Sequence, residues 1–507
     1  MKKNILTLAL GATLLGGAFS SCDLLEEDSS VIIETKTYFK QESELVGAIT
    51  PIYNYIFKDN TRFGGISGRG FSLNCGDPAL TSIRGLNKQR MLEFDDFNVS
   101  ENNDDITAVW KAMYRAIGAA NNVISSRDRI EKIAMDATKR EVYMAEAHFL
   151  RALAYYNIVS YWGKGPIVEK LLTGDEAKLV KNATAEEIYN FIIADLEIAK
   201  VIPEERGELG RVNQDAVRML KAYVYMNMAG YPLNKGNEYY KKAADAAAEV
   251  ISTASHSLDD NFADLWKADN RFKKSEHIFF FYGNYDLGRD LASYGGKGLR
   301  GTEEGGWKDY VVETEFYNNF PNDNRKKETI YDVIKFNKKG LSLPESKYIN
   351  CLDAKEKHTW VGKYRDLGGS PWKDVTTNTI YPVFRYADAL LILAEADNLA
   401  NGGPTPRAYD ALRRIQHRAY DGTAEVTRII ADGATMDSFD KVVLQERMWE
   451  FAFENKTWIT MVRRQKVEEF NKNHDKEVAG FSIASITESD YFFPIPEHET
   501  LINSNLK

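Results

Sequence analysis

The least regular part of the sequence contains aromatic side chains beside glycines and polar residues. The candidates for stacking on a ligand are Tyr294 in LASYGGKG, Trp307 and Tyr310 in GGWKDY, Trp360 in HTWVGK and Trp372 in SPWKD. The faces of a pyranose ring carry C–H groups and its edges carry hydroxyls, so a sugar site combines aromatic platforms with planar polar side chains. These segments therefore favour a flat-faced ligand such as a sugar, although loop tryptophans also fill small satellite cores.

The motifs of metal-dependent, nucleotide-dependent or nucleophilic catalysis are missing from the sequence. The seven histidines are dispersed without H-E-x-x-H spacing, and the cysteines form no C-x-x-C pair. There is no P-loop or G-x-S-x-G, and no G-x-G-x-x-G stands between a strand and a helix. The acidic run at 102–105 lacks the D-x-D-x-D-G spacing of a calcium loop, which favours a solvated face. We therefore expect no cofactor, no metal ion and no enzymatic activity.

Carboxylates are abundant in the sequence, but abundance alone does not make a glycosidase, which needs two acids at a defined separation. The acids that stand out are in predicted helices that also carry arginines: Glu146, Glu395, Glu446, Glu450 and Glu454, with Arg151, Arg385, Arg447 and Arg463. Acid and arginine in facing helices are typical of ion-pair networks. We predict a structural network here in preference to an acid/base pair.

The composition is that of a soluble globular protein with an acidic surface. The chain has 507 residues and a formal net charge of -9, with 27% charged residues. This balance argues against nucleic acid as a partner, because nucleic-acid surfaces need clustered Lys and Arg. The 27 Tyr, 25 Phe and 8 Trp provide many flat faces for packing or for a ligand.

The N-terminus has the pattern of a secretory signal. Residues 1–21 begin with two lysines and continue as an apolar run that is too short and Gly-rich to span a membrane, so we predict a signal peptide. The sequence Ser-Ser-Cys ending at Cys22 resembles a bacterial lipobox, which implies lipidation of Cys22; an ordinary signal peptide with an incidental cysteine is the alternative. Residues 22–36 form a flexible acidic tether. Cys75 and Cys351 are either one disulfide or two buried thiols.

Helical periodicity dominates the rest of the chain. The strongest case is 136–162, where alanines alternate with large residues over many turns without Gly or Pro, as in a helix packed on several sides. Further helices are predicted at 37–57 with a break near Pro51, and at 105–133, 184–203, 213–228, 237–255, 386–400, 404–419, 439–453 and 457–471. Helices that arrive in pairs with short turns are the signature of a helical-repeat scaffold.

Two stretches interrupt the helical pattern. Residues 59–99 collect glycines and form a long loop region, and long loops in compact domains are usually functional. Residues 257–380 are rich in glycine and aromatics, which predicts an inserted irregular subdomain with short strands. The chain therefore divides into an N-terminal helical-repeat region at 37–256, this insertion, and a C-terminal helical-repeat region with a tail at 381–507.

Several of these segments together resemble the SusD/RagB family of surface glycan-binding lipoproteins. The segments that carry the resemblance are AEAHFLRALAYYNIVSYWGKGPIV from Ala145, LKAYVYM from Leu220, FYNNFPNDNRKK from Phe316 with its D-x-R, Gly362-Lys363-Tyr364, FRYADALLILAEADN from Phe384, ALRRIQHRA from Ala411, QERMWEFAFE from Gln445, and YFFPIPEHETLINSNL from Tyr491. They follow the family order from the lipobox to the C-terminus. There are two departures: 456–463 lacks the family's Asp, and the closing Pro-Asn-Leu reads Ser504-Asn505-Leu506.

The resemblance implies a mainly α fold of about four tetratricopeptide-like helix pairs. We expect its third pair to be split, with one helix near 237–255, its partner near 384–400 and the insertion between them. The resemblance also implies that the loop holding Asn74, Asp77 and Arg84 faces the ligand.

In function, the resemblance implies a non-catalytic lid lipoprotein at the cell surface. It would bind an oligosaccharide, be anchored to the outer membrane through lipid on Cys22, and deliver its ligand to a SusC-like TonB-dependent transporter. The alternatives are a peptide-binding lid as in the RagB branch, a helical glycoside hydrolase, and a purely structural scaffold.

Overall fold

The computed structural model describes residues 38–507 apart from 59–64, 69, 71–72, 74–75, 83–88, 206–209, 271, 274, 284–308, 336, 338–340, 354–357, 366–377, 379 and 473–485. The predicted signal peptide, the tether and Cys22 lie outside the described residues, as does Cys75. Among the candidate site residues, Asn74, Arg84, Tyr294, Trp307 and Trp372 also lie outside them. In the described part of the chain, no helix is long and apolar enough to cross a membrane.

The helix predicted most strongly is helix α7, Ala137–Trp162. Asp136 caps its first turn by accepting a hydrogen bond from the Lys139 N–H, and Gly163 ends it in the left-handed conformation at φ 69°. Nearly every residue from Tyr143 to Trp162 is buried, which confirms a helix packed on more than one side. Its alanines allow close approach of its neighbours.

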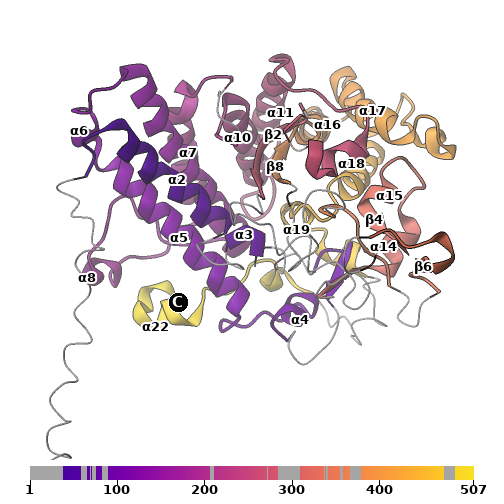
Figure 1. The fold of residues 1–507 in the computed structure, drawn as a ribbon, viewed down its shortest axis with the longest axis horizontal. Coiled ribbons are helices and arrows are strands. Elements are labelled where there is room, and N and C mark those ends of the chain that lie inside the picture. The colour runs from indigo at the N-terminus through magenta and orange to yellow at the C-terminus, as the bar shows by residue number, and fades with distance from the viewer. Residues whose placement is uncertain are drawn as a thin grey trace, which may run out of the picture.

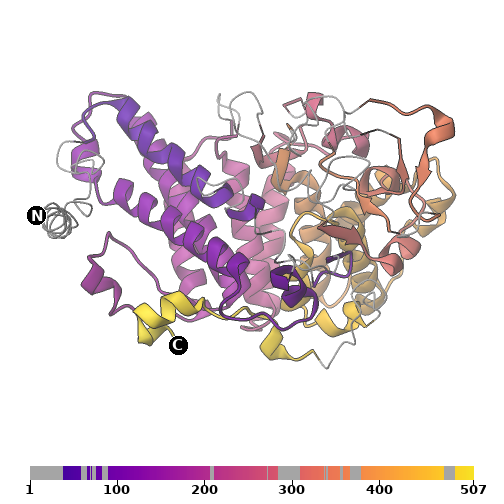
Figure 2. The same cartoon turned by 60° about the horizontal axis from the view of Figure 1, so that its bottom comes forward.

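The N-terminal helices pack around α7. Helices α2 (Glu42–Phe57), α5 (Asp104–Ile124) and α9 (Ala185–Ile198) all contact it, and α10 (Gln214–Ala229) packs beside α9. Thr184 begins α9 with the capping box that its sequence predicts. Figures 1 and 2 show these helices side by side in the indigo to magenta half of the molecule.

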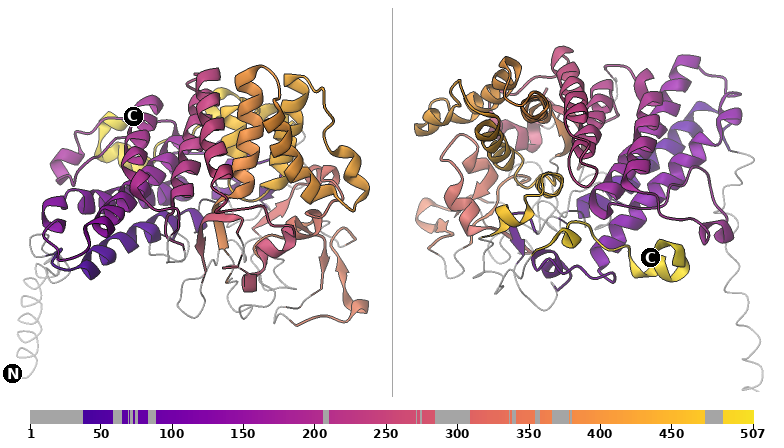
Figure 3. Two further views of the ribbon diagram at one scale, coloured as in Figure 1. Left: turned by 90° about the horizontal axis from the view of Figure 1, so that it is seen from above. Right: turned by 180° about the vertical axis from the view of Figure 1, so that it is seen from behind.

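The third helix pair is split along the chain, as predicted. Helix α11 (Asn237–Ser252) packs on α16 (Tyr386–Asn401). Theirs is the most extensive contact between two elements in the described part of the chain. Strands β2 (His277–Tyr282) and β8 (Ile380–Arg385) lie at the two ends of the insertion and pair antiparallel. The chain therefore leaves the scaffold and returns to it at the same place. Helices α11 and α16 can then pack as a pair although the insertion separates them in the sequence. The seen-from-above view shows the two helices side by side, with the insertion on one face of the scaffold (Figure 3).

The C-terminal region continues the helical array. Helices α17 (Pro406–Tyr420) and α18 (Met436–Glu450) pack on α16, and α19 (Thr457–Arg463) and α20 (Val467–Asn471) follow. The scaffold is thus a mainly α, tetratricopeptide-like helical array. One hydrophobic cluster runs from Phe39 to Leu506 and includes residues of the insertion, so the three sequence regions share a core.

The insertion is built from short strands and short helices. Within it, β4 (Ile330–Tyr331) pairs with β7 (Trp360–Val361) and β5 (Val333–Ile334) pairs with β6 (Ile349–Asn350); its helices are α14 (Thr314–Asn319) and α15 (Lys326–Thr329). Its strand β3 (Tyr310–Val312) pairs with β1 (Leu80–Ser82) of the 59–99 loop region. The remaining short elements are α3 (Gly65–Gly68), α4 (Gln89–Asp95), α6 (Arg127–Ile130), α8 (Gly174–Ala177) and α22 (Glu497–Ile502), and the 3-10 helices η3 (Ala199–Val201), η4 (Phe262–Trp266), η5 (Ala268–Asn270), η6 (Glu345–Lys347), η8 (Ala424–Arg428), η9 (Glu488–Asp490) and η10 (Ser504–Leu506).

Several predicted boundaries were wrong. Helix α2 runs through Pro51 without a break, and the helix predicted at 105–133 ends at Ile124. The helix predicted at 457–471 is interrupted between α19 and α20, where Gln465 takes a φ of 49°. The acidic run at 102–105 is a helix start: Asn103 caps α5, and Asp105 is buried with its Oδ1 3.0 Å from Arg90 Nε. It is therefore not the solvated face that its composition suggested.

A buried ionic network joins the insertion to the scaffold, as the paired acids and arginines predict. Arg385, at the end of β8, has its Nη1 3.0 Å from Glu450 Oε1 and its Nη2 2.8 Å from Glu454 Oε1. Arg325 of the D-x-R segment has its Nη1 3.1 Å from Glu450 Oε2 and its Nη2 2.6 Å from Asp323. None of these five side chains exposes any surface. A charge buried this deeply is tolerated only when its partners are in place, so the network fixes how the insertion sits on α18.

The C-terminal tail is tied to the helical scaffold. Trp162 Nε1 donates to the Pro494 carbonyl at 3.0 Å, and the Phe493 N–H donates to the Tyr161 carbonyl at 2.9 Å. Asn503 reaches the segment around α8 by donating to the Val180 carbonyl at 2.8 Å. The prediction that the tail is held down is therefore confirmed, although it also contains the short helix α22.

Candidate functional site

Strand pairing brings together three of the sequence segments that were predicted to face a ligand, those that contain Asp77, Tyr310 and Trp360. Strand β1, which follows Asp77, pairs with β3, which begins at Tyr310. Val312 of β3 forms a bridge with Thr359, and β7 begins at the next residue, Trp360. Segments more than 200 residues apart in the sequence thus form one small cluster of strands.

The described side chains from these segments are buried. Asp77 is 3% exposed, and its Oδ1 accepts the Ala79 N–H at 2.8 Å, which is the geometry of a turn. Tyr310 is 0% exposed and Trp360 is 1% exposed. Trp360 packs with Val311, Ile334 and Cys351 in a small satellite core. A ring without accessible surface offers no stacking face, so the prediction that Tyr310 and Trp360 are ligand platforms does not fit their burial.

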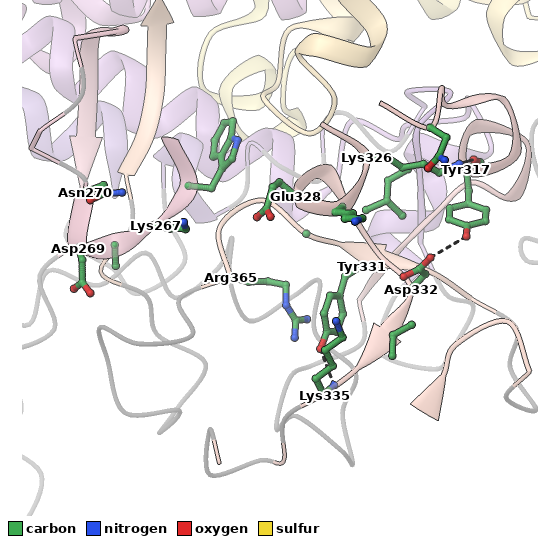
Figure 4. A pocket seen from close by; sticks show the side chains of 17 residues that line it. Lys267, Asp269, Asn270, Tyr317, Lys326, Glu328, Tyr331, Asp332, Lys335 and Arg365 are labelled. Atoms are coloured by element: carbon green, nitrogen blue, oxygen red, sulfur yellow. Dashed lines mark hydrogen bonds between the residues drawn. The ribbon is translucent and has the colours of Figure 1, made fainter. Parts of the chain in front are cut away.

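A cavity of the described structure lies beside this cluster. Its volume is about 880 Å³, within the ~300–1,000 Å³ that is usual for ligand pockets. Its lining includes Trp266, Lys267, Asp269 and Asn270 of the η4–η5 region, Tyr317, Lys326, Lys327 and Glu328 of α14 and α15, Tyr331, Asp332 and Lys335 around β4 and β5, and Gly362 and Arg365 after β7. We call this space the insertion cavity. In Figure 4, Asp269 and Asn270 lie on one side of it, Tyr317 and Asp332 on the other, and Arg365 and Tyr331 between them.

Tyr331 and Arg365 form the centre of the insertion cavity. The Arg365 guanidinium lies 3.4 Å from the centroid of the Tyr331 ring, which is a stacked cation–π contact. The Tyr331 hydroxyl accepts the Lys335 N–H at 2.9 Å, which fixes the ring at its other end. The cavity therefore contains an ordered aromatic ring and a planar polar group side by side.

The side of the cavity formed by α14 and α15 is also ordered. Tyr317 donates its hydroxyl hydrogen to Asp332 Oδ2 at 3.0 Å, and burial together with Asp332 raises the pKa of Tyr317 to about 12. Lys326 Nζ donates to the Tyr317 and Phe320 carbonyls at 3.0 Å each. Burial raises the pKa of Glu328 and lowers that of Lys326. These are groups that hydrogen-bond a polar ligand, held on short elements.

The Gly362-Lys363-Tyr364 segment supports the floor of the cavity. The Gly362 N–H donates to the Thr329 carbonyl at 2.8 Å. Lys363 Nζ reaches Glu454 Oε1 at 2.7 Å, and burial lowers the pKa of Lys363 to about 8. The Tyr364 hydroxyl donates to the Phe453 carbonyl at 3.1 Å. The segment thus connects α15, which lines the cavity, to the residues that follow α18 in the helical scaffold.

Gly362→Ala tests this support. A Cβ at Gly362 would lie 2.5 Å from the Glu328 carbonyl oxygen, so the backbone of α15 must move. We expect the free energy of unfolding to fall by about 1–3 kcal/mol, as measured by urea denaturation. Gly174→Ala is the matched control, since a Cβ there has no neighbour within 4 Å. Equal stability of the two variants would contradict the close contact.

Sequence reasoning missed the residues that form the centre of the cavity. Tyr331 and Arg365 belong to no motif of their own, and neither is next to a glycine. The signal that could have found Arg365 is its position directly after the Gly362-Lys363-Tyr364 segment. In the part of the chain that the structure describes, no group of His, Cys, Asp and Glu residues is arranged to hold a metal ion.

Comparison with known proteins gives consistent matches along the chain. Residues 337–507 match the model of the SusD family, and residues 80–226 match a model described as starch-binding associating with outer membrane. The SusD-like protein P2 of Formosa agariphila is 28% identical over 531 aligned positions, which cover 100% of this chain and 99% of that protein. The starch-binding protein SusD of Bacteroides thetaiotaomicron is 34% identical over 128 residues, or 25% of this chain and 22% of that one.

Solved structures match over nearly the whole fold. A SusD superfamily protein from Parabacteroides distasonis is 25% identical, with a TM-score of 0.78 over 92% of this chain and 98% of that one. A likeness of this extent covers the helical scaffold and the insertion together.

Proposed function

Because the chain belongs to the SusD-like family, we propose that it binds an oligosaccharide at the cell surface without cleaving it. The observation that carries this proposal is the insertion cavity, where the Tyr331 ring and the Arg365 guanidinium are stacked beside Asn270 and Asp332. Aromatic faces with planar polar groups next to them are what a pyranose ring requires. A relative named as starch-binding supports a carbohydrate as the ligand class.

We also propose that residues of the neighbouring loops take part in binding. Asn74, Arg84, Tyr294, Trp307 and Trp372 lie outside the described residues, so their role as ligand contacts remains a prediction from the sequence. The strands β1 and β3 that flank two of these loops are paired beside the cavity's supporting strands.

The proposed cellular role is that of a lid lipoprotein. The N-terminal match to a model described as associating with outer membrane supports a location at that membrane, and we propose lipid on Cys22 as the anchor. The proposed partner is a SusC-like TonB-dependent transporter. The protein extracted from membranes should co-purify with such a transporter, and Cys22→Ala should abolish this co-purification because the protein is no longer anchored. When the soluble Cys22→Ala protein is mixed with the transporter, the two should still bind, which separates anchoring from partnership.

Binding is tested by calorimetry with a panel of oligosaccharides and the purified chain that starts after Cys22. We expect Tyr331→Ala to weaken binding by about tenfold, because stacking on one ring contributes on the order of 1 kcal/mol. Tyr331→Phe keeps the ring and should bind as the wild type does. Tyr348→Ala, an exposed tyrosine that does not line the cavity, is the control.

Assays of the same purified chain for product release and for peptide binding separate the alternative functions. Release of new reducing ends, abolished by Glu328→Gln, would replace the binding proposal with hydrolysis, because Glu328 has a raised pKa and shares the cavity with Asp332. Binding of peptides without any sugar would favour the peptide-binding branch. Failure to bind either class would favour a scaffold.

A further inference from the structure

Exposed aliphatic side chains gather on two short segments that are far apart in the sequence. In the described part of the chain, eleven large hydrophobic side chains are exposed, and four of them belong to the segments that contain α8 and α22. These four are Leu171, Leu179, Leu501 and Ile502, which are 51%, 72%, 72% and 52% exposed. We call the surface that carries them the α8–α22 surface. A single exposed leucine is ordinary, but a group of them is typical of a contact site.

Hydrogen bonds from side-chain amides hold the two segments together. Asn503, directly after α22, donates from Nδ2 to the Val180 carbonyl at 2.8 Å. Two further bonds join the same segments, from Asn505 Nδ2 to the Lys178 carbonyl at 3.3 Å and from Asn182 Nδ2 to the Leu506 carbonyl at 2.9 Å. The exposed aliphatic side chains are therefore presented on one fixed surface.

Attraction between opposite charges does not define this surface, because the lysines beside its leucines are already paired. Lys170 Nζ lies 2.9 Å from Glu176 Oε1, and Lys178 Nζ lies 3.1 Å from Asp175 Oδ1. Such exposed pairs contribute little free energy. A lysine next to a leucine suits the border of a bilayer, since its methylene stem lies along apolar groups while its ammonium stays in water. The partner that fits is one that buries aliphatic side chains and leaves charged groups hydrated.

The described chain begins at the same end of the molecule. Tyr38, the first described residue, is sixteen positions after Cys22, and a chain of that length has a root-mean-square span on the order of 20–25 Å. Phe39 is buried, and the Arg129 guanidinium of α6 lies 5.9 Å from the centroid of its ring. Helices α6, α8 and α22 all lie at one end of the long axis (Figures 1 and 2). A lipid on Cys22 would therefore keep this end of the molecule near the bilayer.

Building on the proposed lipid anchor at Cys22, we infer that the α8–α22 surface rests on the lipid bilayer that holds the anchor. Its four aliphatic side chains enter the headgroup region, and Lys170 and Lys178 keep their ammonium groups in water. The contact adds a second, weaker membrane signal to the lipid. It also orients the body, because the insertion lies at the other end of the long axis and stays clear of the bilayer (Figure 1).

Flotation with vesicles of phosphatidylcholine measures the contact without the anchor. The protein is the purified chain that starts after Cys22, and the lipid has no net charge, so the experiment reports apolar burial. We expect the ratio of bound to free protein to fall at least about tenfold in the double variant Leu179→Ser/Leu501→Ser, because each substitution removes an aliphatic side chain that leaves water on binding. Added salt should not weaken binding of the wild type.

Leu341→Ser is the matched control for flotation. Leu341 is 60% exposed, as the leucines of the α8–α22 surface are, but it belongs to the insertion. This variant should bind vesicles as the wild type does. Because all the replaced side chains are exposed, every variant should keep the wild-type midpoint of urea denaturation.

Hydrogen exchange tests the contact in the lipid-anchored protein. The lipidated chain in phosphatidylcholine vesicles is compared with the chain that starts after Cys22 in solution. Amides of 170–182 and 497–507 should exchange more slowly on the vesicles, whereas amides of 341–352 should exchange at the same rate. The lipidated double variant should lose this protection.

Each outcome decides for or against the inference. Equal flotation of the wild type and the double variant, or unchanged exchange of both segments on vesicles, would overturn it. Protection that appears only when a transporter is added would assign the surface to a protein partner and would also overturn it. If the lipidated chain stays on vesicles without this protection, the inference fails while the anchor stands. If mass spectrometry finds no lipid on Cys22, the anchor fails, and flotation alone decides on the surface.

Discussion

Replacing Arg385 with alanine is expected to lower the free energy of unfolding by on the order of 3–5 kcal/mol. The Arg385 side chain exposes no surface, and its Nη1 and Nη2 atoms reach Glu450 at 3.0 Å and Glu454 at 2.8 Å. A third carboxylate, Glu276, pairs with the same Nη1. Removing the arginine leaves three buried acids to share Arg325, Arg418 and Lys363, and the under-compensated buried charge is far costlier than a lost surface pair.

Urea denaturation at neutral pH measures this loss. Arg127→Ala is the matched control, because Arg127 pairs with Glu131 and Glu141 while about half exposed, so its removal should cost less than about 1 kcal/mol. A loss below about 1 kcal/mol for Arg385→Ala as well would mean that the network is not holding the insertion to the scaffold.

The pH dependence gives the same prediction a second test. Burial alone would raise the pKa of Glu454, but Arg385, Lys363 and Lys456 outweigh burial and lower it to about 2, from an ordinary value of 4.5. A lowered pKa in the folded state contributes stability that is complete above about pH 4.5 and is lost as the pH falls towards 2. The stability difference between the wild type and Arg385→Ala should therefore narrow over that interval.

The helical scaffold could be predicted from the sequence because its signals are local. The alternation of small and large residues in 136–162 and the capping box at Thr184 each act within a few turns of one helix. The split of the third pair was expected within the fold that the family resemblance implies, and it agrees with helical periodicity that stops at one point and resumes at another. The pairing of β2 with β8 then closes the gap between α11 and α16.

The sequence predicts which acids and arginines form ionic networks, but it does not predict which acid pairs with which arginine. Glu146 and Arg151 belong to the same helix, yet Arg151 pairs with Asp195 of α9, and Glu146 pairs with Arg211. The segment 456–463 lacks the family's Asp, and Arg463 instead binds Glu395 of α16 at 2.6 Å. Which acid meets which arginine depends on how neighbouring helices are rotated and spaced, and a periodic pattern does not specify that.

The candidate site was harder to predict because burial in the insertion depends on distant pairings. Tyr310 and Trp360 look like exposed loop aromatics when each is read with its neighbouring glycines. Their burial follows from strands β1, β3, β4 and β7 meeting across the insertion. Tyr331, in contrast, keeps accessible surface because it lies at the cavity, opposite Trp360 in the β4–β7 pair.

Trp360→Ala is expected to destabilise the insertion by about 3–5 kcal/mol, because removing a fully buried indole leaves a void that the surrounding side chains cannot fill. Its neighbours Val311, Ile334 and Cys351 form a small cluster apart from the main core, so the loss should be local. Limited proteolysis would then cut within 310–365 at temperatures where the scaffold helices still give their full circular dichroism signal.

Trp360→Phe separates a structural role from a ligand platform. Phenylalanine keeps a buried ring on β7, so the variant should stay folded, and because the ring at 360 has no accessible surface, its affinity for glycans should equal that of the wild type. Tyr331→Ala, on the partner strand β4, should show the opposite result, with the fold kept and binding weakened. If instead Trp360→Phe lowered glycan affinity without lowering stability, the indole would be contacting the ligand, and β7 would have to open during binding. The two partner residues of the β4–β7 pair thus make opposite predictions, one for stability and one for affinity.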